Sequence, residues 1–125
     1  MKSEFEEMFE KEIRKKFQEW KTFLKTNYSY PLIEGEDTAG LIVPVLDTTV
    51  QVKVGLEDGN FYCQVDVNHL RKKILSDDIK DKVRCFLDDE DERQIWKYLP
   101  EDTSYIDIFE LLKNVIQVLL KPSDA

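Results

Sequence analysis

The stretch TTVQVKVGLEDGNFYCQVDV, residues 48–67, decides the fold class of this chain. Apolar and polar residues alternate along both of its halves, which is typical of strands with one face on a core and the other in water. Between the halves, Asp58-Gly59 is a strong signal for a tight hairpin turn. The stretch therefore predicts two antiparallel strands. One face of this hairpin is expected to carry Val50, Val52, Val54, Phe61, Cys63, Val65 and Val67.

A third strand is predicted just before the hairpin, over LIVPVL, residues 41–46. Pro44 cannot donate a backbone hydrogen bond, so this strand is expected to lie at a sheet edge or to carry a bulge. The preceding residues 26–40 contain several turn-forming Asn, Pro and Gly residues and are interpreted as a loop. Together the strands predict an antiparallel meander with one face in water.

Residues 3–25 have the periodicity of an amphipathic helix. Ser3 and Glu6 have the spacing of a capping box, which satisfies free amides of a first helical turn. We expect the helix to lie across the sheet with its apolar face in the core, and the alternative is a helix that binds a partner or dimerises. Its apolar residues are Phe5, Met8, Phe9, Ile13, Phe17, Trp20, Phe23 and Leu24.

Two short helical segments are predicted after the hairpin. The first is capped by Asn68 and carries Leu70, Ile74 and Leu75. The second opens at Ser76 or Asp77 and carries Ile79, Val83 and Phe86. Residues 82–87 fit a helix or a strand equally well, and the acidic residues 87–93 that follow are interpreted as a solvated turn.

A final helix is predicted from about Ser104 to Leu120, where Lys121-Pro122 ends it. Its apolar residues extend beyond one stripe, with Leu112 and Leu119 at the centre and Leu111 and Val118 to the side. The predicted fold class is α+β, with an N-terminal helix, a three- to four-stranded antiparallel meander and C-terminal helices packed on one face. We expect residues 1–125 to form a single domain, because this length suffices for one core.

The charge balance narrows the classes of partner. The chain has 26 Asp and Glu against 18 Lys and Arg, a net charge of −8, which disfavours nucleic acids and anionic membranes. No apolar run approaches the roughly 20 residues needed to cross a bilayer. The charged N-terminal sequence does not resemble a signal peptide, and two cysteines do not form a disulfide framework. We therefore expect a soluble protein of the cytoplasm, with the nucleus as the other reducing compartment.

The residues that carry chemistry point away from catalysis. Cys63 shares its strand face with apolar residues, so burial should raise its pKa and lower its thiolate fraction. His69, six residues later, is too distant along an extended strand to serve as its base. We therefore predict no catalytic, cofactor or metal site and no enzyme activity, and the alternative is a small cysteine-dependent enzyme.

The C-terminal sequence WKYLPEDTSYIDIFELLKNVIQVLLKPSDA and the element order resemble the ubiquitin-conjugating-enzyme fold and its RWD-domain relatives. The residues that carry the resemblance are Trp96, Pro100, Leu112, Ile116, Leu119, Leu120, Pro122 and Asp124. Residues 81–87, DKVRCFL, are similar to the fourth strand of that fold. The His-Pro-Asn tripeptide of active members is missing, as is their tyrosine-proline motif. The resemblance therefore implies a catalytically inactive variant that is used as a binding or scaffold domain.

The expected function is a non-enzymatic protein-interaction or scaffold module within a multiprotein assembly, which the resemblance links to the ubiquitin-like conjugation pathway. The alternative is a small acidic dimeric secretion or export chaperone, marked by an exposed apolar patch and a symmetric dimer. The expected partner is another protein, and a homodimer is included among the candidates. The candidate partner surface consists of Leu111, Val118, Trp96 and Tyr98.

Overall fold

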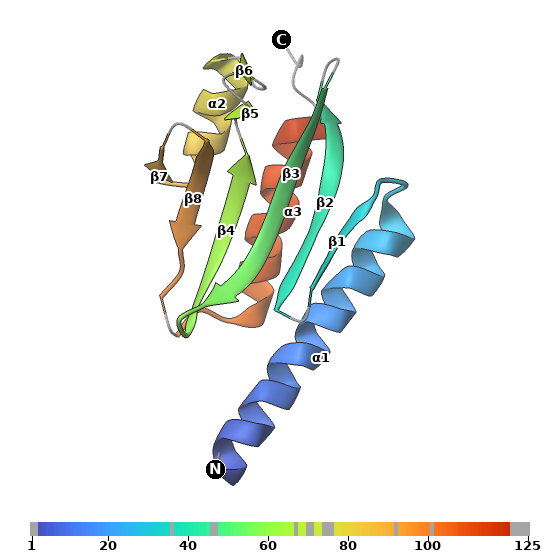
Figure 1. The fold of residues 1–125 in the computed structure, drawn as a ribbon, viewed down its shortest axis with the longest axis vertical. Helices are drawn as coiled ribbons and strands as arrows, with labels where there is room; N and C mark the ends of the chain where they lie inside the picture. Colours follow the sequence, from blue (N-terminus) through green and yellow to red (C-terminus); the bar gives the residue numbers. More distant parts are fainter. Residues whose placement is uncertain are drawn as a thin grey trace.

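A six-stranded sheet with helices on one face forms the centre of the protein (Figure 1). The computed structural model describes residues 3–35, 37–45, 48–66, 68–69, 72–73, 77–91, 93–100 and 102–120. Every neighbouring pair of strands is antiparallel. This confirms the α+β fold class, with more strands than the three to four predicted. In sheet order the strands are β1 (Leu32–Gly35), β2 (Thr38–Val45), β3 (Thr48–Glu57), β4 (Asn60–Asp66), β8 (Gln94–Tyr98) and β7 (Asp89–Glu90).

The predicted hairpin is confirmed in β3 and β4. Asp58 and Gly59 have φ values of 51° and 82°, so both turn residues occupy the positive-φ region that a two-residue hairpin turn requires. Val54 pairs with Cys63 in the resulting register. The face that meets the helices buries Val50, Val52, Val54, Cys63 and Val65, whereas Val67 lies outside the described residues.

The prediction of a loop over residues 26–40 is wrong in part. Residues 32–35 form β1, and β2 already begins at Thr38. The strand β1 is only four residues long and is bounded by Pro31 and Gly35, so the turn-forming residues mask its short apolar pattern.

The prediction that the strand carrying Pro44 lies at a sheet edge or carries a bulge is wrong for the strand as a whole, because β2 pairs with β1 on one side and with β3 on the other. Only the end of β2 that contains Pro44 lacks a partner on the β1 side. The amide of Ile42 donates to the carbonyl of Pro31. The backbone N–H of Ile42 therefore points toward β1 and away from β3, and the backbone nitrogen of Pro44, two residues later, points the same way. The strand β1 begins at Leu32, which pairs with Leu41. Pro44 therefore lies beyond the strand, where its missing N–H costs no ladder bond.

Two helices, α1 (Glu4–Asn27) and α3 (Tyr105–Leu120), pack on the same face of the sheet, and α3 lies behind the sheet in Figure 1. Side-chain oxygens cap both helices, because Ser3 accepts from the amide of Glu6 and Ser104 accepts from the amide of Asp107. Trp20 of α1 stacks on Phe109 of α3 with 5.8 Å between ring centroids. Aromatic packing thus connects the two helices above the sheet.

The segment between β4 and α3 differs from the prediction in two places: its first residues form a short hairpin instead of a helix, and residues 89–90 and 94–98 form the strands β7 and β8, neither of which was predicted. Asn68–His69 (β5) and Lys72–Lys73 (β6) pair as short antiparallel strands, so the helix predicted after Asn68 is wrong at these four residues. Leu70, Ile74 and Leu75 lie outside the described residues. The backbone pairing of β5 with β6 replaces the helical bonds that a cap at Asn68 would have started.

The second short helix is confirmed as α2 (Asp77–Arg84), which buries Ile79 and Val83. Residues 82–84 are helical and a turn follows at 85–86, so DKVRCFL does not form a strand there. In the acidic stretch, residues 88–91 and 93 are exposed as predicted, whereas Leu87 is fully buried. The stretch also contains the two-residue strand β7, which pairs with β8.

Candidate interaction surface

Cys63 lies in the core, as its strand parity predicts. Its side chain is fully buried between the sheet and the helices, and this burial raises the pKa of the thiol to about 12. A thiol with that pKa supplies almost no thiolate at neutral pH, so it is a poor nucleophile. The backbone of His69 belongs to β5, beyond the end of β4.

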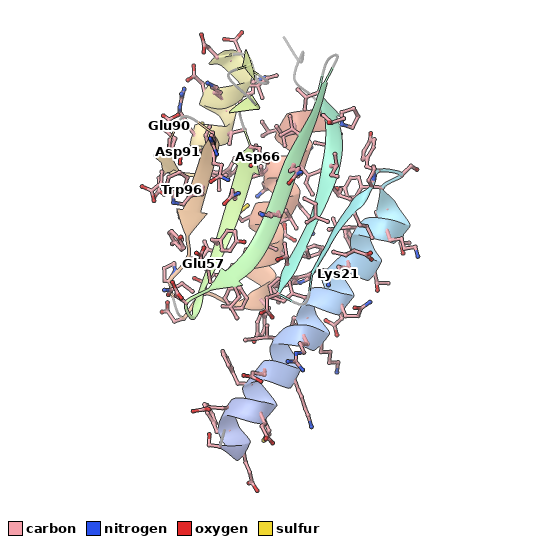
Figure 2. The ribbon with its side chains drawn as sticks, viewed as in Figure 1. Lys21, Glu57, Asp66, Glu90, Asp91 and Trp96 are labelled. Carbon is pink, nitrogen blue, oxygen red and sulfur yellow. The ribbon has the colours of Figure 1, made fainter. Side chains whose placement is uncertain are left out.

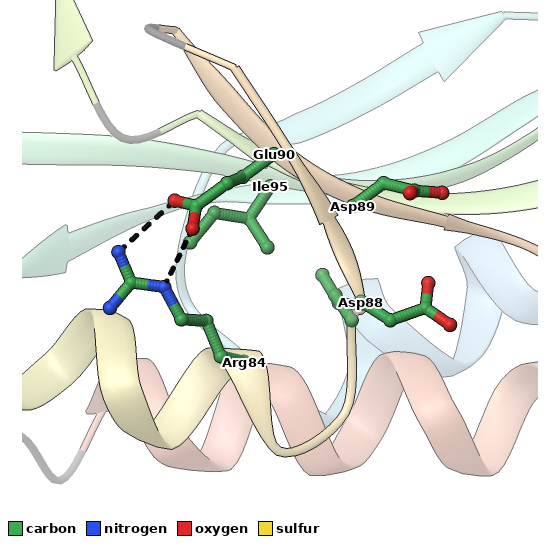
Figure 3. Close-up of a pocket in the computed structure, with 6 residues that line it drawn as sticks. Arg84, Asp88, Asp89, Glu90 and Ile95 are labelled. Atoms are coloured by element: carbon green, nitrogen blue, oxygen red, sulfur yellow. Dashed lines mark hydrogen bonds and ion pairs between the residues drawn. The ribbon is translucent and has the colours of Figure 1, made fainter.

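A shallow hollow lies between the end of α2 and β7 (Figure 3). Its volume is about 210 Å³, and it is lined by Arg84, Leu87, Asp88, Asp89, Glu90 and Ile95. Ligand pockets usually occupy about 300–1,000 Å³, so this hollow is small for a drug-sized ligand.

The one cation of this hollow is already bound by carboxylates. Arg84 donates from Nε and one terminal nitrogen to the two oxygens of Glu90, at 3.0 and 3.1 Å, and from the other terminal nitrogen to Asp81 at 2.6 Å. The bidentate bond lowers the pKa of Glu90 below its ordinary value. This arrangement connects α2 to β7 and leaves an acidic rim, which does not favour an anionic ligand.

Trp96 and Tyr98 lie on the outer face of the sheet, opposite the helices. Their strand parity is opposite to that of the buried Ile95, and Figure 2 shows Trp96 on β8. Trp96 is half-buried beside Gln64, whereas Tyr98 is 49% exposed and donates a long hydrogen bond of 3.5 Å to Glu57. The negative charge of Glu57 raises the pKa of the Tyr98 phenol.

Tyr62 covers the backbone of a neighbouring strand on the same outer face. Its ring lies over Gly55, where an added Cβ would stand 2.6 Å from the ring carbon Cζ. The Tyr98 ring follows at 6.2 Å between centroids. Burial, the main cause, and the charge of Glu57 together raise the pKa of Tyr62. The ring replaces the side chain that Gly55 lacks, so part of this face is occupied by its own residues.

Leu111 and Val118 lie on the other side of the sheet, on one flank of α3. Both are partly buried and packed against the core, while Leu112 and Leu119, on the neighbouring stripe of the helix, are fully buried. The helical spacing puts Phe109, which contacts α1, on the opposite flank. The four residues of the predicted partner surface therefore lie on two separate faces and do not form one patch.

The first third of α1 projects beyond the sheet (Figure 1). Phe5, Met8 and Phe9 are 79%, 70% and 47% exposed, and the first buried residue of the helix is Ile13. We call these three residues the α1 stripe. The expectation that α1 lies across the sheet is correct from Ile13 onward and wrong before it. The sequence identified these residues as apolar, but it assigned them to the core.

Two other large apolar residues of the described chain are exposed. Ile106, in the first turn of α3, is 75% exposed, and Tyr98, on the outer face of the sheet at the end of β8, is 49% exposed. Phe5, Met8 and Phe9 differ from both because they lie together on one helix. Grouped apolar exposure of this kind marks interaction surfaces on folded proteins.

Comparisons of the chain with protein-family models, with curated proteins and with solved structures found no match. Among the described residues, no helix has both the length and the apolar character to cross a membrane.

Proposed function

We propose that this chain is a non-enzymatic protein-interaction module that holds its partner through the α1 stripe. The main support for this proposal is the difference in side-chain burial between the two parts of α1. Ile13, Phe17 and Leu24 are almost completely buried, whereas Phe5 and Met8 on the same helix are largely exposed. Leaving two such side chains in water forgoes about 1.5–3 kcal/mol for each, which a partner surface would recover.

The charges around the α1 stripe favour a protein partner over a lipid surface. Glu4, Glu6 and Glu7 lie in the first turn of α1, next to Phe5 and Met8. Acidic side chains beside the apolar residues are repelled by anionic lipid headgroups, and helices that lie on membranes usually have Lys and Arg in these positions. A protein surface can supply complementary cations.

Two other expectations stay predictions. The link to ubiquitin-like conjugation rests on the resemblance of the element order and of the C-terminal sequence, residues 96–125. The alternative, an acidic dimeric export or secretion chaperone, was expected to expose an apolar patch, and the α1 stripe is such a patch. A chaperone would hold unfolded client segments through it, whereas a scaffold module would hold one folded partner.

The test compares three forms of the chain: the wild type, a stripe variant with Phe5→Ser, Met8→Ser and Phe9→Ser, and a Tyr98→Ser control. Tyr98 is a matched control because its exposure of 49% is close to the 47% of Phe9, and it lies on the opposite face of the sheet. Proteins captured by the immobilised wild type are purified and titrated against all three forms. We expect the stripe variant to lose binding and the control to keep it, with equal melting temperatures. Equal binding by all three forms contradicts the proposal.

A further inference from the structure

We infer that the partner of the α1 stripe is a second copy of this chain, whose α1 pairs with it in the antiparallel direction. This inference rests on the proposed function, since it names the occupant of the same surface. It starts from the projecting segment of α1, residues 4–12, which extends about 13 Å at 1.5 Å per residue. The three apolar side chains of this segment are exposed to water, and a packing partner would remove them from it.

The charges of α1 change sign along the helix. The first turn carries Glu4, Glu6 and Glu7, whereas Lys11, Arg14, Lys15 and Lys16 follow within three turns, with Glu10 and Glu12 among them. In a parallel pair, the acidic first turns of the two copies would face each other. In an antiparallel pair, each acidic first turn faces the basic residues of the other copy. Charge complementarity therefore selects the antiparallel direction.

One edge of the α1 stripe shows this complementarity residue by residue. Glu4, Met8, Lys11 and Lys15 follow one another at spacings of three or four, so they line the same side of the helix. In a two-fold antiparallel pair, this edge of one helix lies against the same edge of the other helix, so every contact between them occurs twice. When the two-fold axis passes next to Met8, between residues 7 and 8, Glu4 faces Lys11 of the second copy, and Lys15 lies one turn further along that helix.

The apolar residues fit the same arrangement. With Met8 near the axis, Phe5 of one copy packs against Phe9 of the other, and the reciprocal contact is identical. The symmetric pair thus covers the three exposed apolar side chains of the α1 stripe in both copies.

Sedimentation equilibrium over a range of concentrations tests the pairing. We expect the wild type and the Tyr98→Ser control to dimerise, and the stripe variant to dissociate at least about 100-fold more readily, since central aromatic contacts dominate small interfaces. Equal melting temperatures at low concentration, where all three forms are monomers, show that the fold is intact. A stripe variant that dimerises like the wild type overturns the inference.

Disulfide trapping tests the direction in a Cys85→Ser background, which removes the exposed cysteine and leaves Cys63 buried. Three single variants are used: Glu4→Cys, Lys11→Cys and Lys15→Cys. Mixing Glu4→Cys with Lys11→Cys should give the most mixed disulfide, mixing it with Lys15→Cys should give less, and each variant alone should cross-link poorly. Efficient cross-linking of Glu4→Cys with itself indicates parallel helices and overturns the antiparallel inference.

The outcomes for the dimer and for the proposed function are distinguishable. A monomeric wild type that binds a different protein through the α1 stripe overturns the homodimer and leaves the interaction module supported. A monomeric wild type whose captured proteins bind the stripe variant equally well overturns both.

Discussion

Leu111 and Leu112 of α3 are adjacent and chemically identical, and they should respond very differently to truncation. Leu112 is fully buried between α3 and the sheet, whereas Leu111 is only partly buried on the flank of the helix. Truncating Leu112 to Ala removes three carbons from water-excluded contact, worth roughly 2.4 kcal/mol at about 0.8 kcal/mol each. The cavity left behind raises the cost to about 3–4 kcal/mol, within the range of buried Leu→Ala changes.

For Leu111→Ala the lost contact is smaller, no closed cavity forms and Ala is the better helix former, so we expect about 1 kcal/mol or less. The assay is urea unfolding of both variants, followed by fluorescence of Trp20 and Trp96. At this chain length 1 kcal/mol shifts the melting temperature by about 3–5 °C, so thermal unfolding separates the two variants as well. Equal losses for the two variants would refute the packing of α3 described above. A binding defect confined to Leu111→Ala would instead restore Leu111 as a partner contact.

Three further predictions concern the core thiol, a sheet glycine and the acidic stretch. Cys63 should resist alkylation in the folded protein and react in denaturant. Since folding raises its pKa from 9.0 to about 12, its contribution to stability is complete below pH 9 and lost as the pH rises toward 12. The alkaline loss of stability should therefore be smaller in Cys63→Ala than in the wild type, with the remainder due to tyrosines whose pKa is also raised. Gly40→Ala should lower the melting temperature strongly, because the new Cβ would lie only 2.7 Å from the Cα of Lys53 in the backbone of β3. At Gly59 a new Cβ would meet no atom, so Gly59→Ala should cost only the strain of a φ of 82°, about 1 kcal/mol. Similar losses for the two variants would contradict the close approach of β2 and β3. Changing Asp88 and Asp89 to Asn and Glu90 to Gln should leave the melting temperature nearly unchanged, because the ion pair of Glu90 with Arg84 is solvent-exposed. A large drop in melting temperature, or a drop that appears only when calcium is removed, would show that the acidic stretch has a structural role.

Features set by neighbouring residues could be predicted from the sequence. The hairpin of β3 and β4 follows from the alternation on either side of Asp58-Gly59, and both turn residues adopt the expected positive φ. The cap of α1 follows from Ser3 in the same way. The short strand β1 could not be predicted, because four residues between a proline and a glycine carry too little pattern.

Features that depend on where elements meet in space were not predictable in the same way. Periodicity correctly placed Phe5 and Phe9 on the apolar side of α1, but burial starts only at Ile13, where the helix reaches the sheet. The four residues of the predicted partner surface lie on two faces of the molecule for a related reason. Trp96 on β8 and Leu111 on α3 are separated by the sheet itself, and no spacing along the chain reports on that.

Pro44 affects how the sheet behaves toward other chains. Beyond the end of β1, β2 is an outer strand, and outer strands with free backbone groups invite strands from other molecules to add to them. At Pro44 the group that would receive such a strand is missing, and its ring projects from an exposed position. Growth of the sheet from one molecule into the next is therefore hindered at this edge. A chain that docks at this edge would have to be recognised through side chains, whose complementarity can be specific, because backbone pairing, which accepts almost any sequence, is blocked at Pro44.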